Sequence, residues 1–284
     1  MGQVDYTVSD HVATIVLNNP EARNAVDSQM SAQLVEAYAD VVSNDDVRVV
    51  IITGEGDRAF CAGASIKGYL SGGVLGQDAE NQRKPIPKPW RIYKPIIAAI
   101  EGYCVGGGFT LALYCDLRVV TTAATLGASG HKRGVANGAT QGTMGTRIVG
   151  RADAMELLFL SKYVDGAEAY RVGLAQRLVE PGGALAEAME MAKTIASFSP
   201  DAVQGTKRLC YDNHDLTWDQ ALDWELEVSE RSFRTADALE GFTAFAEKRE
   251  PVFGQEPALH TLGFEEFWPN ADPPQWRTKP AADS

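Results

Sequence analysis

The chain has 284 residues, of which 45% are hydrophobic and 23% are charged, a composition that is typical of a folded globular protein and excludes a disordered one. Its 38 acidic residues outnumber its 26 basic residues and give a net charge of −12, which disfavours binding to nucleic acid. No apolar stretch approaches the roughly 20 residues that a transmembrane helix requires, so no membrane span is expected.

The first third of the chain alternates strand and helix patterns. β-branched residues at 12–17 and 47–53 predict two strands, each of which ends at a turn rich in Asn, Pro or Gly. Between them, apolar residues recur at helical spacing over residues 27–42 and predict a helix. This succession indicates a sheet covered by helices, which places the chain in the α/β class.

The pattern changes further along the chain. After an irregular segment at 68–92, short apolar runs predict strands at 96–100 and 117–121. Helical periodicity dominates from about residue 139, and helices are expected at residues 152–160, 184–198, 202–210, 218–233 and 236–247. The predicted parts are an α/β core at 1–195, a helical region at 196–250 and a Pro- and aromatic-rich tail at 251–284.

Two segments place a glycine-rich turn between a strand and a helix, namely residues 60–65 (FCAGAS) and 102–109 (GYCVGGGF). Backbone N–H groups at such turns lack intrahelical partners and can point at a negatively charged oxygen. Two converging donors would form an oxyanion hole, in which each donor stabilises developing charge by about 2.7–4 kcal/mol. The alternative is that the glycines only permit tight turns. The chain has no G-x-G-x-x-G at 102–112 and no Gly-Lys-Ser/Thr, so nucleotide-binding turns are not indicated.

Several segments closely resemble the crotonase, or enoyl-CoA hydratase/isomerase, superfamily in residues, order and spacing. They are residues 59–67 (AFCAGASIK), 94–102 (KPIIAAIEG) with the glycines at 106–108, and 247–253 (EKREPVF). Residues 19–20 (NP), 23–25 (RNA) and 167–174 (AEAYRVGL) extend the resemblance to about residues 5–253. The resemblance implies a spiral core of ββα turns and a helical C-terminal region that assembles homotrimers or dimers of trimers. It also implies an acyl-CoA substrate with no permanently bound cofactor and no metal.

The same resemblance implies roles for individual residues. The thioester oxygen would accept hydrogen bonds from the N–H groups of Ala64 and Gly107. The residues expected to face coenzyme A, which is part of the substrate, are Arg23, Ala25, Ala62, Ile66 and Lys67. A few local basic groups would then hold the CoA phosphates despite the acidic net charge.

The chain departs from the superfamily where catalytic acids are expected. Hydratases of the superfamily resemble one another in carrying two glutamates, and the matching positions here are Thr110 and Gly130. A third carboxylate position, used by some isomerases and dehalogenating members, falls at Gly138. Neither Thr nor Gly serves as a general base near neutral pH, and losing such a group typically costs ~10²–10⁴ in rate. Thr110 is left as a candidate hydrogen-bond partner of the acyl chain or a water, or as a packing residue.

His131 is the alternative candidate for proton transfer. It follows Gly130 directly, and its cationic neighbours Lys132 and Arg133 favour the neutral, basic imidazole. The alternative is that the imidazole turns away from the site, since adjacent residues of an extended chain face opposite ways. The small residues Gly130 and Gly138 suggest an enlarged pocket for a branched or cyclic acyl group.

Three functions remain open from the sequence. The preferred one is an acyl-CoA-processing enzyme of the hydratase or isomerase type, which stabilises a thioester enolate and uses non-standard acid–base residues. The alternatives are a non-catalytic acyl-CoA-binding protein and a C–C hydrolase or decarboxylase that acts on a bulky CoA ester. The four cysteines form no C-x-x-C pair and are expected to be buried, and the N-terminus shows no secretion signal, so a cytoplasmic protein is expected.

Overall fold

The computed structural model of the chain describes residues 2–65, 86–89, 92–138 and 140–254. Most of the segment at 68–92 and all of the expected tail beyond residue 254 therefore lie outside the described residues. The chain divides into two compact units, Met1–Ala196 and Ser197–Ser284.

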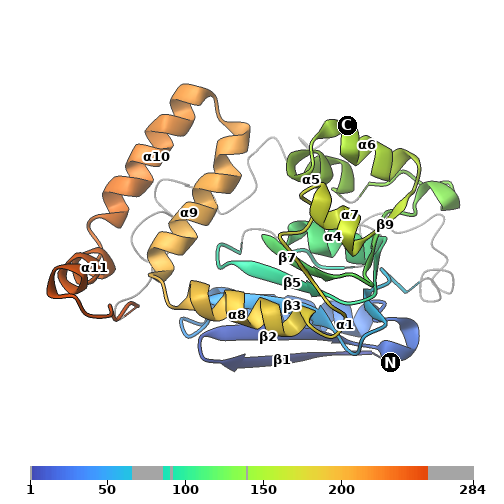
Figure 1. The fold of residues 1–284 in the computed structure, drawn as a ribbon, viewed down its shortest axis with the longest axis horizontal. Helices are drawn as coiled ribbons and strands as arrows, with labels where there is room; N and C mark the ends of the chain where they lie inside the picture. Colours follow the sequence, from blue (N-terminus) through green and yellow to red (C-terminus); the bar gives the residue numbers. More distant parts are fainter. Residues whose placement is uncertain (1, 66–85, 90–91, 139, 255–284) are drawn as a thin grey trace, which may run out of the picture. The chain divides into compact units, whose positions relative to one another are not determined.

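A six-stranded sheet forms the base of the first unit, in the order β1-β2-β3-β5-β7-β10 (Figure 1). β1 (Gln3–Ser9) and β2 (Val12–Asn18) pair as an antiparallel hairpin. The other strands continue the sheet in parallel, namely β3 (Val49–Gly54), β5 (Ile96–Ile100), β7 (Leu117–Thr121) and β10 (Arg177–Val179). β3 and β5 are buried throughout, as parallel strands covered on both faces are. The strands predicted at 12–17, 96–100 and 117–121 are confirmed.

The two faces of this sheet pack against different helices because successive side chains of a strand point to opposite faces. In β3, Val50 and Ile52 belong to the cluster that includes the buried residues of α1 (Ser28–Ser43). Val49 and Ile51 belong instead to the cluster formed with α8 (Ala184–Ala196). α8 contributes the alanines 184, 188, 192 and 196, and these small side chains at four-residue spacing present one narrow face to the sheet.

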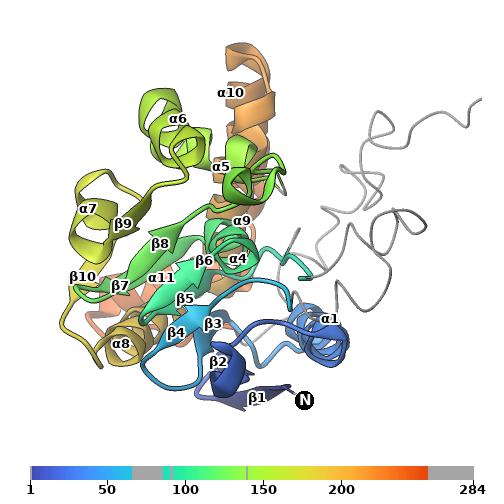
Figure 2. The same ribbon diagram turned by 90° about the vertical axis from the view of Figure 1, so that its right-hand side faces the viewer.

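A smaller sheet of four strands lies above the first one, in the order β4-β6-β8-β9 (Figure 2). Its strands are β4 (Ala59–Cys61), β6 (Tyr103–Val105), β8 (Thr125–Gly127) and the antiparallel edge strand β9 (Tyr163–Asp165). Each of β3, β5 and β7 in the large sheet is followed along the chain by a short strand of the small sheet. β6 then runs into α4 (Gly107–Tyr114), whose residues from Gly108 onward are all buried. This repeated succession is the ββα arrangement that the resemblance implies.

Further helices among the described residues of the first unit are α5 (Gln141–Ile148), α6 (Arg151–Phe159) and α7 (Gly166–Arg171). α6 confirms the helix predicted at 152–160, whereas the short helices α5 and α7 were not predicted.

The described residues of the second unit form helices α9 (Pro200–Asp212), α10 (Trp218–Ser232) and α11 (Ala236–Glu247), and all three were predicted. Ser199, Thr217 and Thr235 cap them by accepting a backbone N–H, and Thr217 forms a capping box with Gln220. A cavity of about 310 Å³ lies within this unit, lined by residues of all three helices. Cys210 on α9 is exposed, so the expected burial is wrong for this cysteine and confirmed for the other three.

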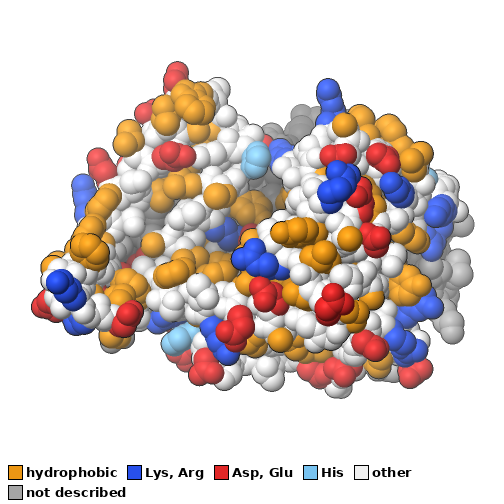
Figure 3. All heavy atoms as spheres, viewed as in Figure 1, with side chains coloured by type: hydrophobic (Ala, Val, Ile, Leu, Met, Phe, Trp, Pro, Cys, Tyr) orange, Lys and Arg blue, Asp and Glu red, His pale blue; other side chains and the backbone are white. Residues whose placement is uncertain are grey.

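Many apolar side chains are exposed on and next to α10 and α11 (Figure 3). The most exposed large ones are Trp218, Leu226, Phe233, Leu239, Phe242 and Phe245, which are 62–85% exposed. The rings of Phe233 and Phe242 stack with centroids 6.1 Å apart. No described helix combines the length and apolar character needed to cross a membrane.

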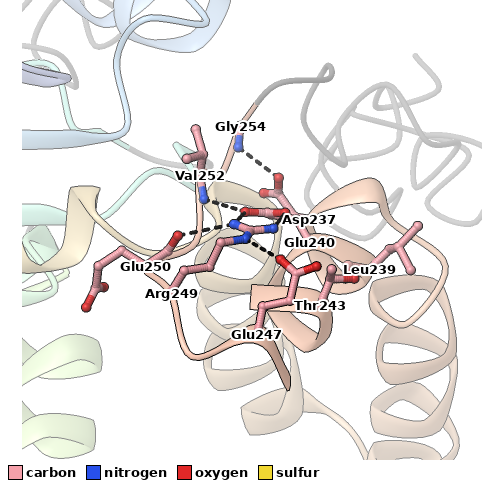
Figure 4. Close-up of polar contacts among 9 residues, drawn as sticks. All are labelled: Asp237, Leu239, Glu240, Thr243, Glu247, Arg249, Glu250, Val252 and Gly254. Carbon is pink, nitrogen blue, oxygen red and sulfur yellow. Dashed lines mark hydrogen bonds and ion pairs between the residues drawn. The ribbon is translucent and has the colours of Figure 1, made fainter. Parts of the chain in front are cut away.

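A polar network ties the chain after α11 to that helix (Figure 4). The Arg249 guanidinium donates to both carboxylate oxygens of Glu240, at 2.6 and 2.8 Å, and to Glu247 at 2.7 Å. Glu240 also accepts the backbone N–H of Val252 at 2.8 Å. The Arg249 hydrogen bonds, followed by that of Val252, lower the pKa of Glu240 to about 2.

Candidate active site

The carboxyl ends of β4, β6 and β8 meet at one edge of the small sheet. Cys61 pairs with Cys104, and Val105 pairs with Gly127, in two parallel ladders. Because parallel strands end at the same edge, the segments that follow them lie together. These segments are residues 62–65, residues 106–107 and residues 128–130.

The first glycine turn is held against residues 23–26 by three backbone hydrogen bonds. Ala62 N donates to Arg23 O at 3.0 Å, and Gly63 O accepts from Val26 N at 2.9 Å. Ser65 N donates to Val26 O at 3.0 Å. The N–H groups of Ala62 and Ser65, on either side of Ala64, therefore have backbone acceptors. Ala64 N–H itself has no acceptor among the described residues.

The second glycine turn connects β6 to α4. Gly106 adopts φ +58°, a conformation that glycine reaches without steric cost, and its N–H donates to Gly127 O at 3.0 Å. Gly107 is the first residue of α4, so its N–H has no intrahelical acceptor. In the described part of the chain this N–H also has no other acceptor.

The two turns are in contact. A Cβ atom built on Gly63 would lie 3.0 Å from Gly107 N, and one built on Gly107 would lie 3.5 Å from Ala64 N. The Cβ position of Gly107 is also 2.7 Å from Ile86 Cδ1, so the Ile86 side chain covers the second turn. Two backbone N–H groups from separate turns, both without an acceptor among the described residues, therefore lie next to each other under an apolar side chain.

Cys61 lies directly before the first turn but is unsuited to nucleophilic attack. It is fully buried, and burial raises the pKa of its thiol to about 12. The thiol therefore stays protonated at neutral pH, and the thiolate is the nucleophilic form. A Cβ on Gly108 would overlap the Cys61 carbonyl, so the α4 backbone packs directly on β4.

Thr110 lies one turn into α4 and is 4% exposed. Its Oγ1 is 3.4 Å from Gly106 O and accepts a hydrogen bond from Gln141 Nε2 at 3.0 Å. Gln141 Nε2 also donates to Gly106 O at 2.8 Å. The Thr110 hydroxyl is thus part of a buried hydrogen-bond group behind the second turn.

The other two positions expected for catalytic acids differ from each other. Gly130 N donates to Asn137 Oδ1 at 2.6 Å, and a Cβ at Gly130 would lie within 2.9 Å of Asn137 Oδ1 and Val135 O. The expectation of enlarged space at Gly130 is therefore wrong, because the Asn137 side chain and the backbone carbonyls of Val135 and Ala136 fill that space. At Gly138, the one described atom near a built Cβ is Ala136 O at 3.8 Å, which leaves room for a ligand.

His131 begins the 3₁₀ helix His131–Arg133, and its side chain is exposed. Among the described residues its imidazole makes no hydrogen bond. Arg133 instead contacts the segment after β8: its Nη1 donates to Ser129 Oγ at 2.5 Å and to Ser129 O at 3.0 Å. Ser129 Oγ in turn lies 3.8 Å from the Cβ position of Gly106. A guanidinium group therefore lies near the second glycine turn.

The residues expected to face coenzyme A are described in part. Arg23, Ala25 and Ala62 lie beside the first turn, and the Arg23 guanidinium lies over the Tyr103 ring, 4.8 Å from its centroid. The Arg23 side chain is exposed and carries positive charge. Ile66 and Lys67 lie outside the described residues.

Comparison with known proteins places this geometry in a family. The sequence profile of the enoyl-CoA hydratase/isomerase family matches residues 7–256. The chain is 35% identical to (E)-benzylidenesuccinyl-CoA hydratase of Thauera aromatica over an alignment of 261 residues. This alignment covers 88% of this chain and 98% of the relative. It is 33% identical to short-chain-enoyl-CoA hydratase of Clostridium acetobutylicum, over 84% of this chain and 92% of the relative. The crystal structure of enoyl-CoA hydratase from Mycobacterium tuberculosis H37Rv matches with a TM-score of 0.82 and 32% identity, over 88% of this chain and 98% of that one.

The chain belongs to the enoyl-CoA hydratase/isomerase family. The expected membership of the crotonase superfamily, the ββα fold and the helical C-terminal region are thereby confirmed. This family acts on CoA thioesters, so the chain is a member of an acyl-CoA-processing family.

Three residues of this family member were missed by sequence reasoning. Gln141 and Asn137 contact Thr110 and Gly130 through side-chain hydrogen bonds, and Ile86 covers Gly107. Gln141 is 35 residues from Gly106 in the sequence, and no local pattern links the two. A polar side chain at the first residue of a short helix carries too weak a signal to be distinguished from a surface residue.

Proposed function

We propose that this chain binds acyl-CoA thioesters and stabilises a thioester enolate between the N–H groups of Ala64 and Gly107. The observation that carries the proposal is the hydrogen-bond pattern of the two turns, which leaves these adjacent donors unpaired among the described residues. In an enoyl thioester, addition of a nucleophile at C3 moves the π electrons onto the thioester oxygen. Two preorganised N–H donors stabilise that charge, and protonation at C2 then returns the electrons to carbon.

Proton transfer requires a group other than Thr110. Its hydroxyl is buried and hydrogen-bonded to Gln141, and an alcohol is too weak a base near neutral pH. Gly130 has no side chain, so we infer that the acid–base residues differ from the usual glutamate pair. His131, in the segment after β8, is our candidate for this role, and its exposed imidazole is accessible to a bound ligand. Replacement by Asn would then lower kcat, because the amide of Asn neither accepts nor releases a proton in this pH range.

We infer that the acyl group is bulky and carries a free carboxylate in addition to its thioester carbonyl. The Thauera aromatica relative is named for a benzylidenesuccinyl thioester, which has an aromatic ring and a free carboxyl group. Two features of this chain support a similar substrate: the open space at Gly138, and the Arg133 guanidinium near the second turn. Arg presents a planar fork of donors that matches a carboxylate.

The CoA part of the substrate would lie along the first turn. Arg23 supplies an exposed positive charge there, and Ala25 and Ala62 lie beside it. We extend this assignment to Ile66 and Lys67 on the resemblance alone. No permanently bound cofactor is part of the proposal, because the thioester itself is the activated group.

We further propose that the exposed apolar side chains of α10 and α11 form a contact between subunits of a homotrimer, alone or as a dimer of trimers. A contiguous group of large, exposed apolar side chains usually marks an interaction site. Phe242 is 62% exposed and stacked on Phe233, so Phe242→Lys would add a charge to this surface. The variant would shift the molar mass measured by light scattering towards that of one chain, and an unchanged mass would contradict the assignment.

The function is tested by incubating the protein with (E)-benzylidenesuccinyl-CoA and with crotonyl-CoA and identifying the products by mass spectrometry. Formation of a hydrated or isomerised thioester supports the proposal. Tight binding of both thioesters without turnover favours a non-catalytic binding protein. Cleavage of a C–C bond or loss of CO₂ favours the hydrolase or decarboxylase alternative. A protein that binds neither thioester contradicts all three.

A further inference from the structure

Gln141, the first residue of α5, has a buried side chain that contacts the second glycine turn. Its side chain is 5% exposed, and its Nε2 donates to Gly106 O at 2.8 Å and to Thr110 Oγ1 at 3.0 Å. A backbone carbonyl oxygen can only accept, so the contact with Gly106 identifies the amide nitrogen of Gln141 as the group that faces the turn.

The direction of Gly106 O determines the direction of a proposed oxyanion donor. Gly106 C=O and Gly107 N–H belong to one peptide group, and this peptide is trans. In a planar trans peptide, the carbonyl and the N–H point in opposite directions. A donor that holds Gly106 O on one side therefore holds Gly107 N–H towards the other side.

Three donors converge on Gly106 O. Besides Gln141 Nε2, they are Thr110 N at 3.1 Å and the Thr110 hydroxyl at 3.4 Å. Hydrogen bonds to a carbonyl oxygen also polarise its peptide group, which makes the attached N–H a stronger donor.

The peptide needs such support because its flanking residues restrain it weakly. Residues 106, 107 and 108 are all glycines, so no Cβ atom limits the rotation of the peptide between Gly106 and Gly107. On the N-terminal side of this peptide, Gly106 N donates a backbone hydrogen bond to Gly127 O at 3.0 Å. A rotation of this peptide would turn Gly107 N–H away from the space next to Ala64.

We propose that Gln141 is a positioning residue that aims Gly107 N–H at the thioester oxygen, an inference that rests on the oxyanion role proposed above. Gln141 does not touch the reacting atoms in this role. It acts through Gly106 O, and Thr110 assists it by donating to the same oxygen.

The experiment compares the wild-type protein with Gln141→Ala, using crotonyl-CoA that carries an isotope label at the thioester carbonyl. In the wild type, binding shifts the infrared band of this carbonyl to lower wavenumber. Gln141→Ala loses most of that shift, and its kcat falls by about 10- to 100-fold while KM changes little, as expected when a reacting group is misplaced by a fraction of an ångström. Thr143→Ala, at an exposed position of the same helix, serves as the control and keeps both values.

Gln141→Glu provides a second test that preserves the size of the side chain. When the buried carboxyl group is protonated it can donate to Gly106 O, and when it is ionised it repels that oxygen. The variant should therefore regain kcat and the infrared shift at low pH and lose both as pH rises. A role in packing alone predicts no such pH dependence.

The outcomes separate the two proposals. If the wild type binds the thioester without an infrared shift, the oxyanion function fails, and the role of Gln141 fails with it. If the wild type shows the shift and both Gln141 variants retain it at every pH, the oxyanion function stands and the positioning role of Gln141 is refuted.

Discussion

Gly63→Ala would place a methyl group against one of the two proposed donors. The new Cβ would lie 3.0 Å from Gly107 N and 3.4 Å from Val105 O, and both neighbours are backbone atoms rather than the ends of flexible side chains. Gly63 also has φ +101°, a region that costs a residue with a Cβ about 1–3 kcal/mol. Loss of one oxyanion donor costs a further ~2.7–4 kcal/mol in the transition state, or about 10²–10³ in kcat.

Gly56→Ala is the matched control for this variant. Gly56 has φ +75°, and apart from its chain neighbours no atom of the described residues lies within 4 Å of its Cβ position, so the substitution adds backbone strain without a contact at the site. Urea unfolding should show a loss of stability in both variants, and both should stay folded because a domain typically has about 5–15 kcal/mol of stability. Turnover of the thioester substrate should fall only in Gly63→Ala. Equal turnover in the two variants would refute the assignment of Gly107 N–H to the oxyanion hole.

Three further predictions concern single groups. Arg133→Gln should raise KM for (E)-benzylidenesuccinyl-CoA by about 10-fold or more and leave that for crotonyl-CoA unchanged, because a paired charge is worth about 1.5–3 kcal/mol only where a carboxylate is present; equal changes in steady-state KM would contradict the carboxylate assignment. A thiol reagent such as dithionitrobenzoate should label Cys210 alone in the native protein and all four cysteines after unfolding, and Cys210→Ser should abolish the native reaction; native labelling of that variant would show that the buried thiols become accessible. Hydrogen bonds from Arg249 and Val252 lower the pKa of Glu240 to about 2 from its usual 4.5, so their stabilising effect is complete above about pH 4.5 and is lost between that pH and about 2; acid titrations of thermal stability should show the wild type and Glu240→Gln converging in this range, and a constant difference would contradict the assignment.

The sequence was most informative where burial on both faces of a strand produces a continuous apolar run. β3 and β5 are buried throughout and mostly apolar because both faces of the large sheet are covered, and their positions were predicted closely. β1 was missed because its residues are half-buried or exposed, so its composition resembles that of a loop. β4, β6 and β8 have three residues each, and their pairing is set by contacts between distant segments rather than by local pattern.

The two glycine turns of the candidate site could be predicted from the sequence, whereas the side chains that support them could not. Ala64 and Gly107 could be located because the glycine turns have a distinctive spacing that resembles the family. Asn137 could not be anticipated, because its contact with Gly130 depends on how the loop between them folds back. The same loop fills space that the absence of a side chain at Gly130 led us to expect as open.

The two proposed donors come from successive ββα repeats, and their separation is therefore fixed by the pairing of β4 with β6 and by the packing of α4 against β4. Stabilisation of the enolate would then be encoded in main-chain geometry, whereas proton transfer is encoded in side chains at other positions. Substitution of the residues at 110, 130 and 138 leaves the main-chain donors in place. A fold built in this way can acquire a different reaction through a few side-chain replacements while it retains the same thioester site.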